Sequence, residues 1–387
     1  MPSPTLGRDP TIAVVHDWLD TWAGGEQCLA QILALYPRSE LFALVDFFPP
    51  ELRARIGGRR AHTSFLQHLP GARAHFRRLL PLFPAAIERL DISRFDLVIS
   101  SSHAVAKGVR THPRQLHLCY CYTPIRYAWD LREQYLAQVG LAHGIRGALV
   151  RRLLDRIREW DRTASSRVQR FVAISEHVAR RIERCYDRPA IVVYPPVSVL
   201  DVPPTEVPRR AYLTVSRLVP YKRIDLMAAA FRMLPDRELI VIGEGPERRR
   251  IEAAAGPNVR LLGEVPDAER DAWLGRARAF VFAAEEDFGI APVEAQAFGT
   301  PVIAYGAGGA TETIRGLDAP SPTGVFFVEQ TPAAIAAAVR DFEAHAERIS
   351  AQACRDNAKR FAVDRFRREF AACIASEWTA FAARQTR

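Results

Sequence analysis

Short apolar runs alternate with segments of helical periodicity along the chain, and this alternation limits the fold more than any other feature. It is typical of βα units that build parallel sheets. Each half of the chain holds enough candidate strands for one open sheet. They are residues 11–16, 41–45, 96–100, 115–122, 170–174 and 190–194 in the first half, and 211–215, 238–242, 259–262, 279–283, 301–304 and 324–327 in the second. The sequence therefore predicts an α/β protein with two doubly wound domains in tandem.

Proline-rich segments at residues 194–197 and 202–208 mark the boundary between the two halves. Proline has no backbone N–H, so it suits a linker better than an inner strand. We therefore predict domains at residues 1–196 and 197–362, each large enough to bury its own core. The chain then turns helical and alanine-rich, and residues 363–387 are expected to pack back on the N-terminal domain as a C-terminal helix.

The charge of the chain is unevenly distributed. The 387 residues include 53 Lys or Arg and 44 Asp or Glu, a net charge of +9, whereas residues 51–196 alone carry 26 basic and 12 acidic side chains, or +14. In residues 73–83, arginines stand beside Phe and Leu side chains that we expect to be exposed, which favours an anionic membrane surface. For residues 146–162, an ordinary amphipathic helix with solvated arginines is the favoured interpretation.

Other classes of partner and location find little support. A recognition helix, an RNA-binding aromatic signature and a zinc-ligand spacing are all missing, so we expect no nucleic acid partner. No signal peptide and no run of 18 apolar residues is visible, which predicts a cytoplasmic protein held peripherally at the inner face of the membrane. The six scattered cysteines lie mostly in apolar runs, as reduced core residues do.

Two glycines, Gly24 and Gly25, precede a helix that we expect to begin near Glu26. Paired glycines before a helix let backbone amides approach an anion, and the helix dipole favours negative charge there. The segment is not the Gly-x-Gly-x-x-Gly fingerprint of dinucleotide sites, and a plain turn is the alternative. Gly24 and Gly25 are therefore candidate phosphate contacts.

Two cations, Arg217 and Lys222, follow the first candidate strand of the second half. Open α/β sheets bind ligands at the carboxyl ends of their strands, where these cations could hold a diphosphate. The chain has only three lysines beside fifty arginines. Arginine therefore serves wherever a generic surface cation suffices, which favours a specific role for Lys222 over a solvated surface position.

The segment from Glu286 to Glu294 is the most specific in the chain. An acidic loop containing Gly289 follows a strand, and Pro292 suits the first turn of a helix. Glu286 then lies in the loop and Glu294 about one turn into the helix, so both carboxylates can face one crevice. Simple capping of a helix N-terminus would explain Glu286 but not Glu294.

These motifs resemble those of a known family. Seven residues separate Glu286 from Glu294, as in the Glu-x7-Glu signature of retaining GT-B glycosyltransferases of family 4, and Arg217 with Lys222 resembles that family's diphosphate-binding pair. The resemblance covers essentially the whole chain. Within the family, three segments are most similar to bacterial mannosyltransferases of O-antigen and exopolysaccharide assembly: residues 16–18, 120–124 and 126–130.

The resemblance implies a GT-B architecture of two Rossmann-like domains that hold a sugar nucleotide between them. Glu294 would accept hydrogen bonds from the ribose hydroxyls. Arg217 and Lys222 would neutralise the diphosphate and replace the metal that other glycosyltransferases use. No Asp-x-Asp segment is present to hold a metal, so we expect neither a metal nor another cofactor.

The resemblance also implies roles at the donor sugar. Glu286 would bind its hydroxyls together with backbone amides near Phe288, Gly289 and Ile290. Glu286 would orient the sugar rather than act as a nucleophile, while the acceptor attacks from the face of the leaving group. His103, which follows the candidate strand 96–100, would contact the same sugar, with a structural or capping role as its alternative.

Two carboxylates are weaker candidates at the acceptor side. A double-displacement mechanism would need a carboxylate on the opposite face of the sugar, and Asp17 and Asp130 remain open for it. Asp17 is a candidate acceptor contact, with a plain role at a helix start as the alternative.

Three functional hypotheses follow. The first is a retaining, metal-independent mannosyltransferase that uses GDP-mannose and a lipid-linked glycan acceptor. The second keeps the chemistry but takes a UDP-sugar, because the Glu-x7-Glu segment does not recognise the base. The third is a catalytically silent subunit of a polysaccharide-assembly complex, whose mark would be loss of Glu286, Lys222 or Arg217. All three residues are present.

Overall fold

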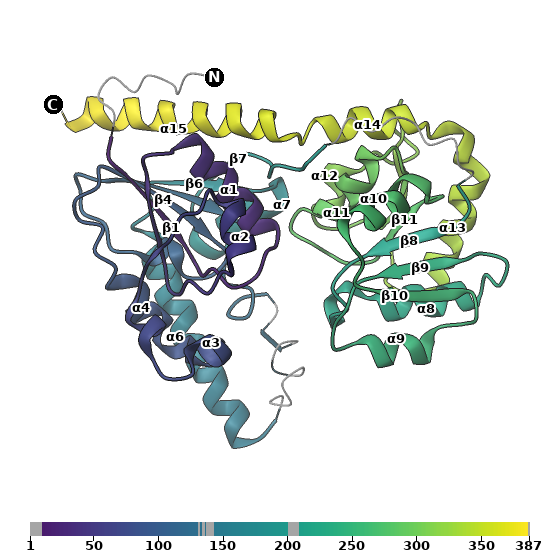
Figure 1. Ribbon diagram of the computed structural model, residues 1–387, viewed down its shortest axis with the longest axis horizontal. Helices are drawn as coiled ribbons and strands as arrows, with labels where there is room; N and C mark the ends of the chain where they lie inside the picture. The colour runs from purple at the N-terminus through teal and green to yellow at the C-terminus, as the bar shows by residue number, and fades with distance from the viewer. Residues whose placement is uncertain (1–9, 131, 134–135, 137–142, 200–208, 386–387) are drawn as a thin grey trace. The chain divides into compact units, whose positions relative to one another are not determined.

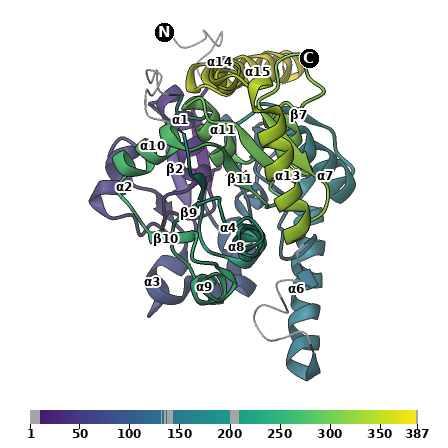
Figure 2. The same ribbon diagram turned by 90° about the vertical axis from the view of Figure 1, so that its right-hand side faces the viewer.

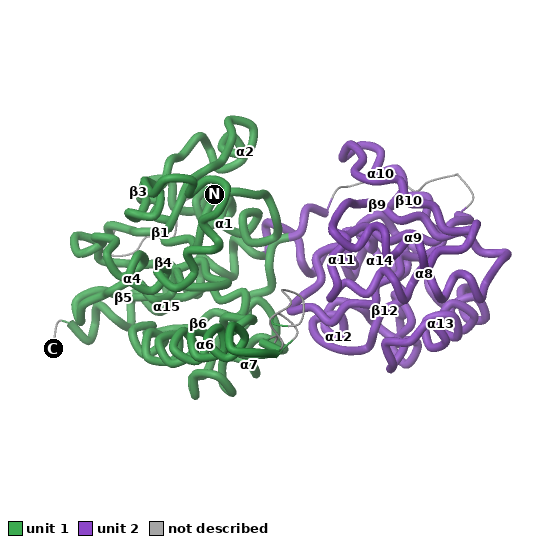
Figure 3. The backbone as a smooth tube through the Cα atoms, turned by 90° about the horizontal axis from the view of Figure 1, so that it is seen from below, with its two compact units in different colours: residues 1–196, 366–387 green, residues 197–365 purple. Residues whose placement is uncertain are grey.

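Two parallel sheets organise the chain, one in each of two units (Figure 1). The computed structural model describes residues 10–130, 132–133, 136, 143–199 and 209–385. The first unit comprises residues 1–196 and 366–387 and the second residues 197–365 (Figure 3). The division after residue 196 coincides with the predicted boundary. The predicted linker at residues 202–208 lies outside the described residues.

The first unit has a seven-stranded sheet in the order β3-β2-β1-β4-β5-β6-β7. Its strands are β1 (Ile12–His16), β2 (Glu40–Ala43), β3 (His62–Thr63), β4 (Leu97–Ser102), β5 (Leu116–Cys121), β6 (Arg170–Ala173) and β7 (Ala190–Val192). The six predicted strands are confirmed, with ends shifted by up to two residues. The sequence missed β3, because two residues are too short to show an alternating pattern.

Helices and 3-10 turns surround this sheet. They are α1 (Gly24–Leu35), α2 (Pro50–Arg55), η1 (Phe65–His68), α3 (Ala72–His75), η2 (Phe76–Leu82), α4 (Phe83–Glu88), η3 (Ala106–Gly108), α6 (Gly144–Ser165), α7 (Glu176–Tyr186) and α15 (Val363–Gln385). α15 returns to the first unit: the rings of Phe366 and Phe370 pack edge-on against Tyr120 of β5. Arg170 of β6 also pairs with Glu377 of α15 at 2.7 Å.

The second unit has a six-stranded sheet in the order β10-β9-β8-β11-β12-β13. All six predicted strands are confirmed as β8 (Tyr212–Val215), β9 (Leu239–Ile242), β10 (Val259–Gly263), β11 (Phe280–Phe282), β12 (Val302–Tyr305) and β13 (Gly324–Phe327). Its helices and 3-10 turns are η4 (Pro220–Lys222), α8 (Ile224–Arg232), α9 (Arg248–Ala254), α10 (Asp267–Arg276), α11 (Ile290–Ala297), α12 (Ala310–Thr313), α13 (Pro332–His345), η5 (Ala346–Arg348) and α14 (Ala351–Lys359).

Alternate residues of β9 serve two hydrophobic cores on the two faces of this sheet. Leu239 and Val241 belong to the core under α8 and α13, whereas Ile240 and Ile242 belong to the core under α10 and α11. Successive side chains of a strand point to opposite faces, and helices cover both faces here. This explains why the strand reads as a continuous apolar run instead of an alternating one.

In each sheet, the direction in which successive strands are added reverses at one place. The chain passes from β1 to β2 and β3 toward one edge, and β4 then starts next to β1 on the other side. In the second unit, β8, β9 and β10 run toward one edge and β11 starts next to β8. Open α/β sheets bind ligands beyond the carboxyl ends of the strands at such a switch point. The two candidate sites are therefore the loops after β1 and β4 and the loops after β8 and β11.

Candidate functional site

Asp17, directly after β1, holds the loop after β4 in place. Its Oδ2 accepts hydrogen bonds from the backbone N–H of His103 (2.6 Å) and Ala104 (3.0 Å), and its Oδ1 accepts from Val105 (2.6 Å) and Ala106 (2.7 Å). The side chain is fully buried. Burial opposes ionisation, but His103 and the backbone donors outweigh it, so the pKa of Asp17 lies well below its ordinary value.

This arrangement corrects the prediction for Asp17. A carboxylate with no exposed surface and four backbone donors cannot meet an acceptor, and it is a poor nucleophile because its charge is already neutralised. Asp17 does not start a helix of its own either. It anchors the turn that leads into η3 and that carries His103.

His103 is the exposed member of this first cluster. Its Nδ1 lies 3.0 Å from Asp17 Oδ2, its ring packs edge-on against Trp18 at 4.5 Å between centroids, and its side chain is 32% exposed. Burial works against a charged imidazole, but the Asp17 carboxylate outweighs it and raises the pKa of His103. The ring is thus held in a fixed orientation and favoured in its cationic form.

His16 and Glu26 complete the cluster. His16 Nδ1 lies 3.1 Å from the Ser101 carbonyl and 3.0 Å from the Ser101 hydroxyl, and its Nε2 lies 3.5 Å from Glu26 Oε1. Glu26 Oε2 accepts the backbone N–H of Ala23 at 2.8 Å. Despite burial, the neighbouring His16 keeps the pKa of Glu26 below its ordinary value.

The helix α1 begins at Gly24, two residues before Glu26, so both glycines lie in its first turn. Glu26 therefore caps its own helix and already supplies one negative charge at that N-terminus. A Cβ on Gly25 would meet only ordinary contacts, at 3.7 Å from Tyr122 and 3.9 Å from His16. Packing in this unit does not demand glycine at position 25. The predicted anion contact stays a prediction.

A buried ion pair lies behind the His103 turn. Lys107 Nζ is 2.7 Å from Asp161 Oδ1 and donates to the Ala104 carbonyl at 2.6 Å, and both side chains are fully buried. Asp161 Oδ2 accepts from Tyr186 (2.7 Å) and from Trp129 Nε1 (2.9 Å). The turn is thus held from two sides: Asp17 accepts hydrogen bonds from the N–H groups of the turn, and Lys107 donates one to its Ala104 carbonyl. Sequence reasoning missed Lys107, although the rarity of lysine that singled out Lys222 applies equally to it.

The predicted Asp130 has other partners. Its carboxylate pairs with two arginines of α7, with Arg181 Nε at 2.5 Å and Arg184 Nη2 at 2.7 Å. Asp130 therefore neutralises two positive charges of α7. Its contact with an acceptor stays a prediction.

In the second unit, Lys222 and Glu286 meet at the switch point. Lys222 ends η4 after β8, Glu286 lies in the loop after β11, and Lys222 Nζ forms an ion pair with Glu286 Oε1. Each side chain is 17% exposed. Arg217 is exposed, and its guanidinium reaches the Tyr221 hydroxyl at 3.5 Å. Among the described residues, no carboxylate pairs with Arg217, so this cation is available to an anion.

Glycine-containing loops support both sides of this site. A Cβ on Gly243 would lie 1.9 Å from the Ser216 carbonyl oxygen, and one on Gly309 would lie 2.3 Å from Phe288 Cα. The loop after β9 therefore packs directly on the Arg217 loop, and the loop after β12 on the Glu286 loop, where the Gly309 N–H donates to the Glu286 carbonyl at 2.8 Å. The run at residues 306–309 was missed, although three glycines in four residues directly after a predicted strand are a visible signal.

The remaining predicted residues lie along α11. Gly289 is its N-cap with φ +85°, Ile290 its first residue, and Phe288 is buried against Phe361 with 5.4 Å between ring centroids. The N-terminus of this helix, whose first N–H groups have no acceptor within the helix, therefore lies three residues after Glu286 in the chain.

Glu294 has a different environment from Glu286. Burial raises the pKa of Glu294; the neighbouring Arg270 of α10 opposes this, and Asp271 and Asp267 add to it. No hydrogen bond or ion pair joins the two glutamates within the described part of the chain. The structure thus places Glu294 beside α10 and Glu286 beside Lys222.

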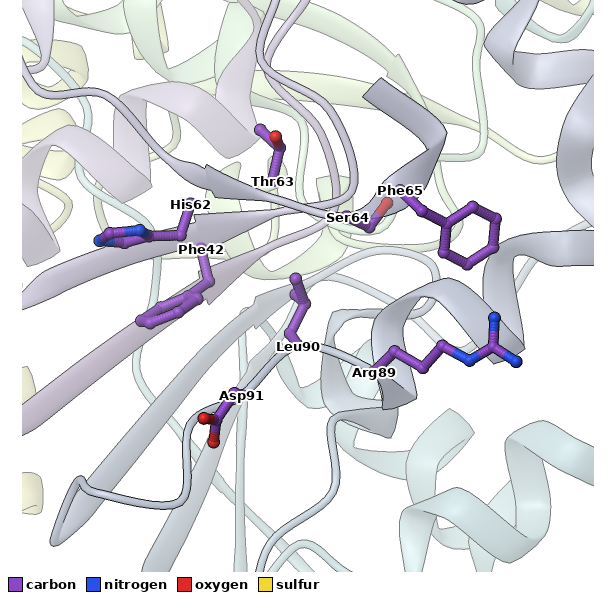
Figure 4. Close-up of a pocket in the computed structure, with 8 residues that line it drawn as sticks. All are labelled: Phe42, His62, Thr63, Ser64, Phe65, Arg89, Leu90 and Asp91. Carbon is purple, nitrogen blue, oxygen red and sulfur yellow. The ribbon is translucent and has the colours of Figure 1, made fainter. Parts of the chain in front are cut away.

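One cavity, of about 450 Å³, lies at the β3 edge of the first unit (Figure 4). It is lined by Phe42, His62, Thr63, Ser64, Phe65, Arg89, Leu90 and Asp91. None of these belongs to the two clusters described above. Within the described residues, no group of three or more His, Cys, Asp or Glu side chains is arranged to hold a metal ion.

Comparison with known proteins finds a family model and several relatives that match parts of the chain. Residues 203–361 match the model of the family described as glycosyl transferases group 1. A phosphatidyl-myo-inositol mannosyltransferase of Propionibacterium freudenreichii subsp. shermanii is 38% identical over 91 residues, 22% of this chain and 22% of that protein. A GDP-mannose-dependent monoacylated alpha-(1-6)-phosphatidylinositol monomannoside mannosyltransferase of Corynebacterium glutamicum is 35% identical over 114 residues, 26% of this chain and 30% of that protein. The matches span less than a third of either relative.

Solved structures share the whole fold. HepE of Anabaena in complex with UDP and glucose has a TM-score of 0.67 at 17% identity, covering 94% of this chain and 99% of that one. Sucrose-phosphate synthase from Thermosynechococcus elongatus has a TM-score of 0.70 at 16% identity, covering 96% and 100%. The predicted GT-B architecture of two Rossmann-like domains with C-terminal helices is confirmed. The segment that matches the glycosyl transferases group 1 model, residues 203–361, thus falls in the second Rossmann-like domain of this GT-B fold.

Proposed function

We propose that this protein is a retaining glycosyltransferase that moves mannose from GDP-mannose onto a lipid-linked glycan in bacterial surface or exopolysaccharide synthesis, without a metal or another cofactor. One observation carries the proposal. Arg217, Lys222 and Glu286 gather at the switch point of the domain that matches glycosyl transferases group 1. The curated relatives named above support mannose and a lipid acceptor, because both are mannosyltransferases named for phosphatidylinositol substrates.

The cations of the site suit a diphosphate leaving group. The bond between the sugar and the phosphate breaks, negative charge grows on the departing diphosphate, and Arg217 and Lys222 neutralise it. Each such preorganised donor contributes about 3 kcal/mol of transition-state stabilisation. A diphosphate at Lys222 competes with Glu286 for the ammonium group, which frees the Glu286 carboxylate to accept hydrogen bonds from the sugar hydroxyls.

The remaining steps follow the same-face mechanism. The acceptor hydroxyl attacks the anomeric carbon from the side of the leaving group and passes its proton to the departing phosphate. His103, favoured in its cationic form by Asp17, donates a hydrogen bond to the donor sugar. Glu294 accepts hydrogen bonds from the ribose hydroxyls, which supplies polar partners to a partly buried carboxyl group. The alternative of double displacement loses Asp17 as a nucleophile, because that carboxylate is fully buried.

The location of the protein is part of the proposal: cytoplasmic, and peripheral at the inner face of the membrane. Among the described helices, none combines the length and the apolar character needed to cross a membrane. We expect no nucleic acid partner.

A UDP-sugar donor is the second candidate, because HepE, a protein of the same fold, was solved with UDP and glucose. The test offers purified protein a panel of sugar nucleotides with a membrane lipid extract and identifies products by mass spectrometry, with EDTA present. Mannose transfer from GDP-mannose supports the proposal, and glucose transfer from UDP-glucose supports the alternative. Absence of binding and turnover across the panel would refute both.

Glu286→Ala distinguishes an enzyme from a silent nucleotide-binding subunit. The variant should abolish transfer while GDP binding stays within a few fold of wild type, because Glu286 contacts the sugar and not the diphosphate in this mechanism. Glu285→Ala, which removes the neighbouring exposed carboxylate, is the control. An unchanged transfer rate in Glu286→Ala would remove Glu286 from the mechanism.

A further inference from the structure

The N-terminal half of α6 carries an exposed stripe of four side chains. Ile145 is 91% and Leu149 69% exposed, the highest values among the exposed large hydrophobic residues of the described first unit. Arg152 and Arg156 are also exposed. The four residues stand at positions i, i+4, i+7 and i+11, which share one face of a helix. We call them the α6 stripe.

The opposite face of the same helix is fully engaged. Its buried residues are Gly147, Leu154, Ile157, Asp161 and Ala164. Their spacing places them about half a turn away from the stripe. The N-terminal end of α6 projects beyond α3 and α4 in both ribbon views (Figures 1 and 2). The α6 stripe therefore points away from the described part of the unit, and packing among those residues does not explain its two aliphatic side chains.

The charges of the stripe lack acidic partners. Among the described residues, no carboxylate pairs with Arg152 or Arg156. Their neighbour Arg151, in contrast, pairs with Glu133 at 3.0 Å. The acidic side chain Asp155 of α6 is taken by Arg132 at 2.7 Å. The stripe thus presents two aliphatic side chains at the tip of the helix and two uncompensated cations one turn further along.

The structure corrects part of the prediction for residues 73–83, because the phenylalanines are buried whereas Leu82 is 41% exposed. Phe76 and Phe83 are 3% and 2% exposed, and their rings stack on each other and pack against Trp18. Arg77 lies over the Phe76 ring and pairs with Asp20. These aromatic side chains form the core beneath the Asp17 cluster, and they are unable to enter a bilayer.

We infer that the α6 stripe docks on an anionic lipid bilayer, which deepens the proposed function and rests on its membrane-borne acceptor. Aliphatic side chains at a helix tip enter the boundary between headgroups and acyl chains, while arginines bind lipid phosphates. Two other occupants fit less well. Two adjacent aliphatic side chains do not contribute to binding a nucleic acid backbone, and the stripe has no aromatic ring for base stacking. A stable protein interface buries about 800 Å² on each side, more than four side chains supply.

The experiment measures cosedimentation of the full chain with vesicles of equal parts phosphatidylglycerol and phosphatidylcholine, and with phosphatidylcholine alone. Wild type should bind the anionic vesicles and lose most binding in high salt. Ile145→Ser with Leu149→Ser should weaken binding at least about tenfold, because two buried aliphatic contacts are lost. Arg152→Gln with Arg156→Gln should weaken it about fivefold per arginine and flatten the salt dependence.

Matched controls remove other exposed side chains of the same kinds in the second unit. Met233→Ser with Val328→Ser, at 49% and 81% exposure in the second unit, should bind like wild type. Arg249→Gln with Arg340→Gln, two exposed arginines of the second unit, should also bind like wild type. All four double variants should keep the wild-type circular dichroism and the wild-type rate of donor hydrolysis in solution.

Several results would overturn the inference: no binding of wild type to anionic vesicles, equal binding to both kinds of vesicle, or unchanged binding of both stripe variants. Tighter binding to duplex DNA than to vesicles would also overturn it. The outcome is separable from the proposed function, because vesicle binding needs no sugar nucleotide. Vesicle binding without turnover would refute the proposed glycosyl transfer alone. Turnover without vesicle binding would refute the stripe and the proposed membrane location but not the glycosyl transfer.

Discussion

Replacing Asp17 with asparagine tests whether this residue holds the loop that presents His103. The change keeps the size of the side chain but removes its charge and turns one acceptor oxygen into an NH₂ group. That group then faces two backbone N–H donors, either those of Val105 and Ala106 or those of His103 and Ala104. Two donors in a buried turn therefore lose their acceptor.

The magnitude follows from those contacts. Hydrogen bonds to a charged group contribute about 1.5–3 kcal/mol each, so losing two lowers the free energy of unfolding of the first unit by roughly 3–6 kcal/mol. This is a large fraction of the stability of a typical domain.

The difference between wild type and Asp17→Asn should also depend on pH in two directions. The lowered pKa of Asp17 means that its contribution is present above its ordinary value of 3.8 and is lost as the pH falls below it. The raised pKa of His103 means that its contribution is present below 6.5 and is lost as the pH rises through the folded-state pKa. The stability difference should therefore be largest between about pH 4 and 6.5.

Urea unfolding by circular dichroism measures the free energy, and amide hydrogen exchange of residues 103–106 reports on the turn itself. Asp20→Asn is the matched control, because Asp20 pairs with the 61% exposed Arg77 and should lose at most about 1 kcal/mol. A loss below about 1 kcal/mol in Asp17→Asn, or unchanged exchange at residues 103–106, would refute the anchoring role.

Three further predictions address other buried or charged groups. Asp161→Asn should lower the free energy of unfolding of the first unit by about 3–5 kcal/mol in urea unfolding. The double variant Asp161→Leu with Lys107→Met should restore part of that loss, because an apolar pair leaves no unpaired charge. Equal instability of the two variants would contradict this. Burial lowers the pKa of His117 to about 3, so the free energy of unfolding of wild type should fall by about 2 kcal/mol between pH 7 and 5. His117→Gln should not show this loss, whereas the exposed control His345→Gln should. Parallel pH profiles of wild type and His117→Gln would exclude the effect. Lys222→Ala should weaken GDP binding at least about tenfold in calorimetry while Lys359→Ala leaves it unchanged, and equal affinities would remove Lys222 from the diphosphate site.

The sequence predicted most of the sheet structure and the second site. Strands buried on both faces appear as short apolar runs, and all twelve predicted strands are present. Arg217, Lys222 and Glu286 were found because each follows one of those strands, and the parallel topology gathers strand ends at one edge.

Residues 73–83 show where a local pattern misleads. The arginines and aromatic residues of this stretch read as an exposed basic patch, but Phe76 and Phe83 pack under Trp18. Residue type and spacing do not reveal which face of a short helical segment meets the core, because two or three turns are too few to define one.

The sequence by itself determined the strands of the two parallel sheets and the loops in which the charged residues lie, since apolar runs mark where each strand begins and ends. Only the tertiary structure decided the role of each charge. Asp17 and Glu286 are both carboxylates in loops after a strand, yet one is fully buried under four backbone N–H groups and the other is 17% exposed and faces a lysine. Burial and hydrogen-bond partners come from segments far apart in the chain, Asp17 and His103 being 86 residues apart, and a local pattern does not contain them.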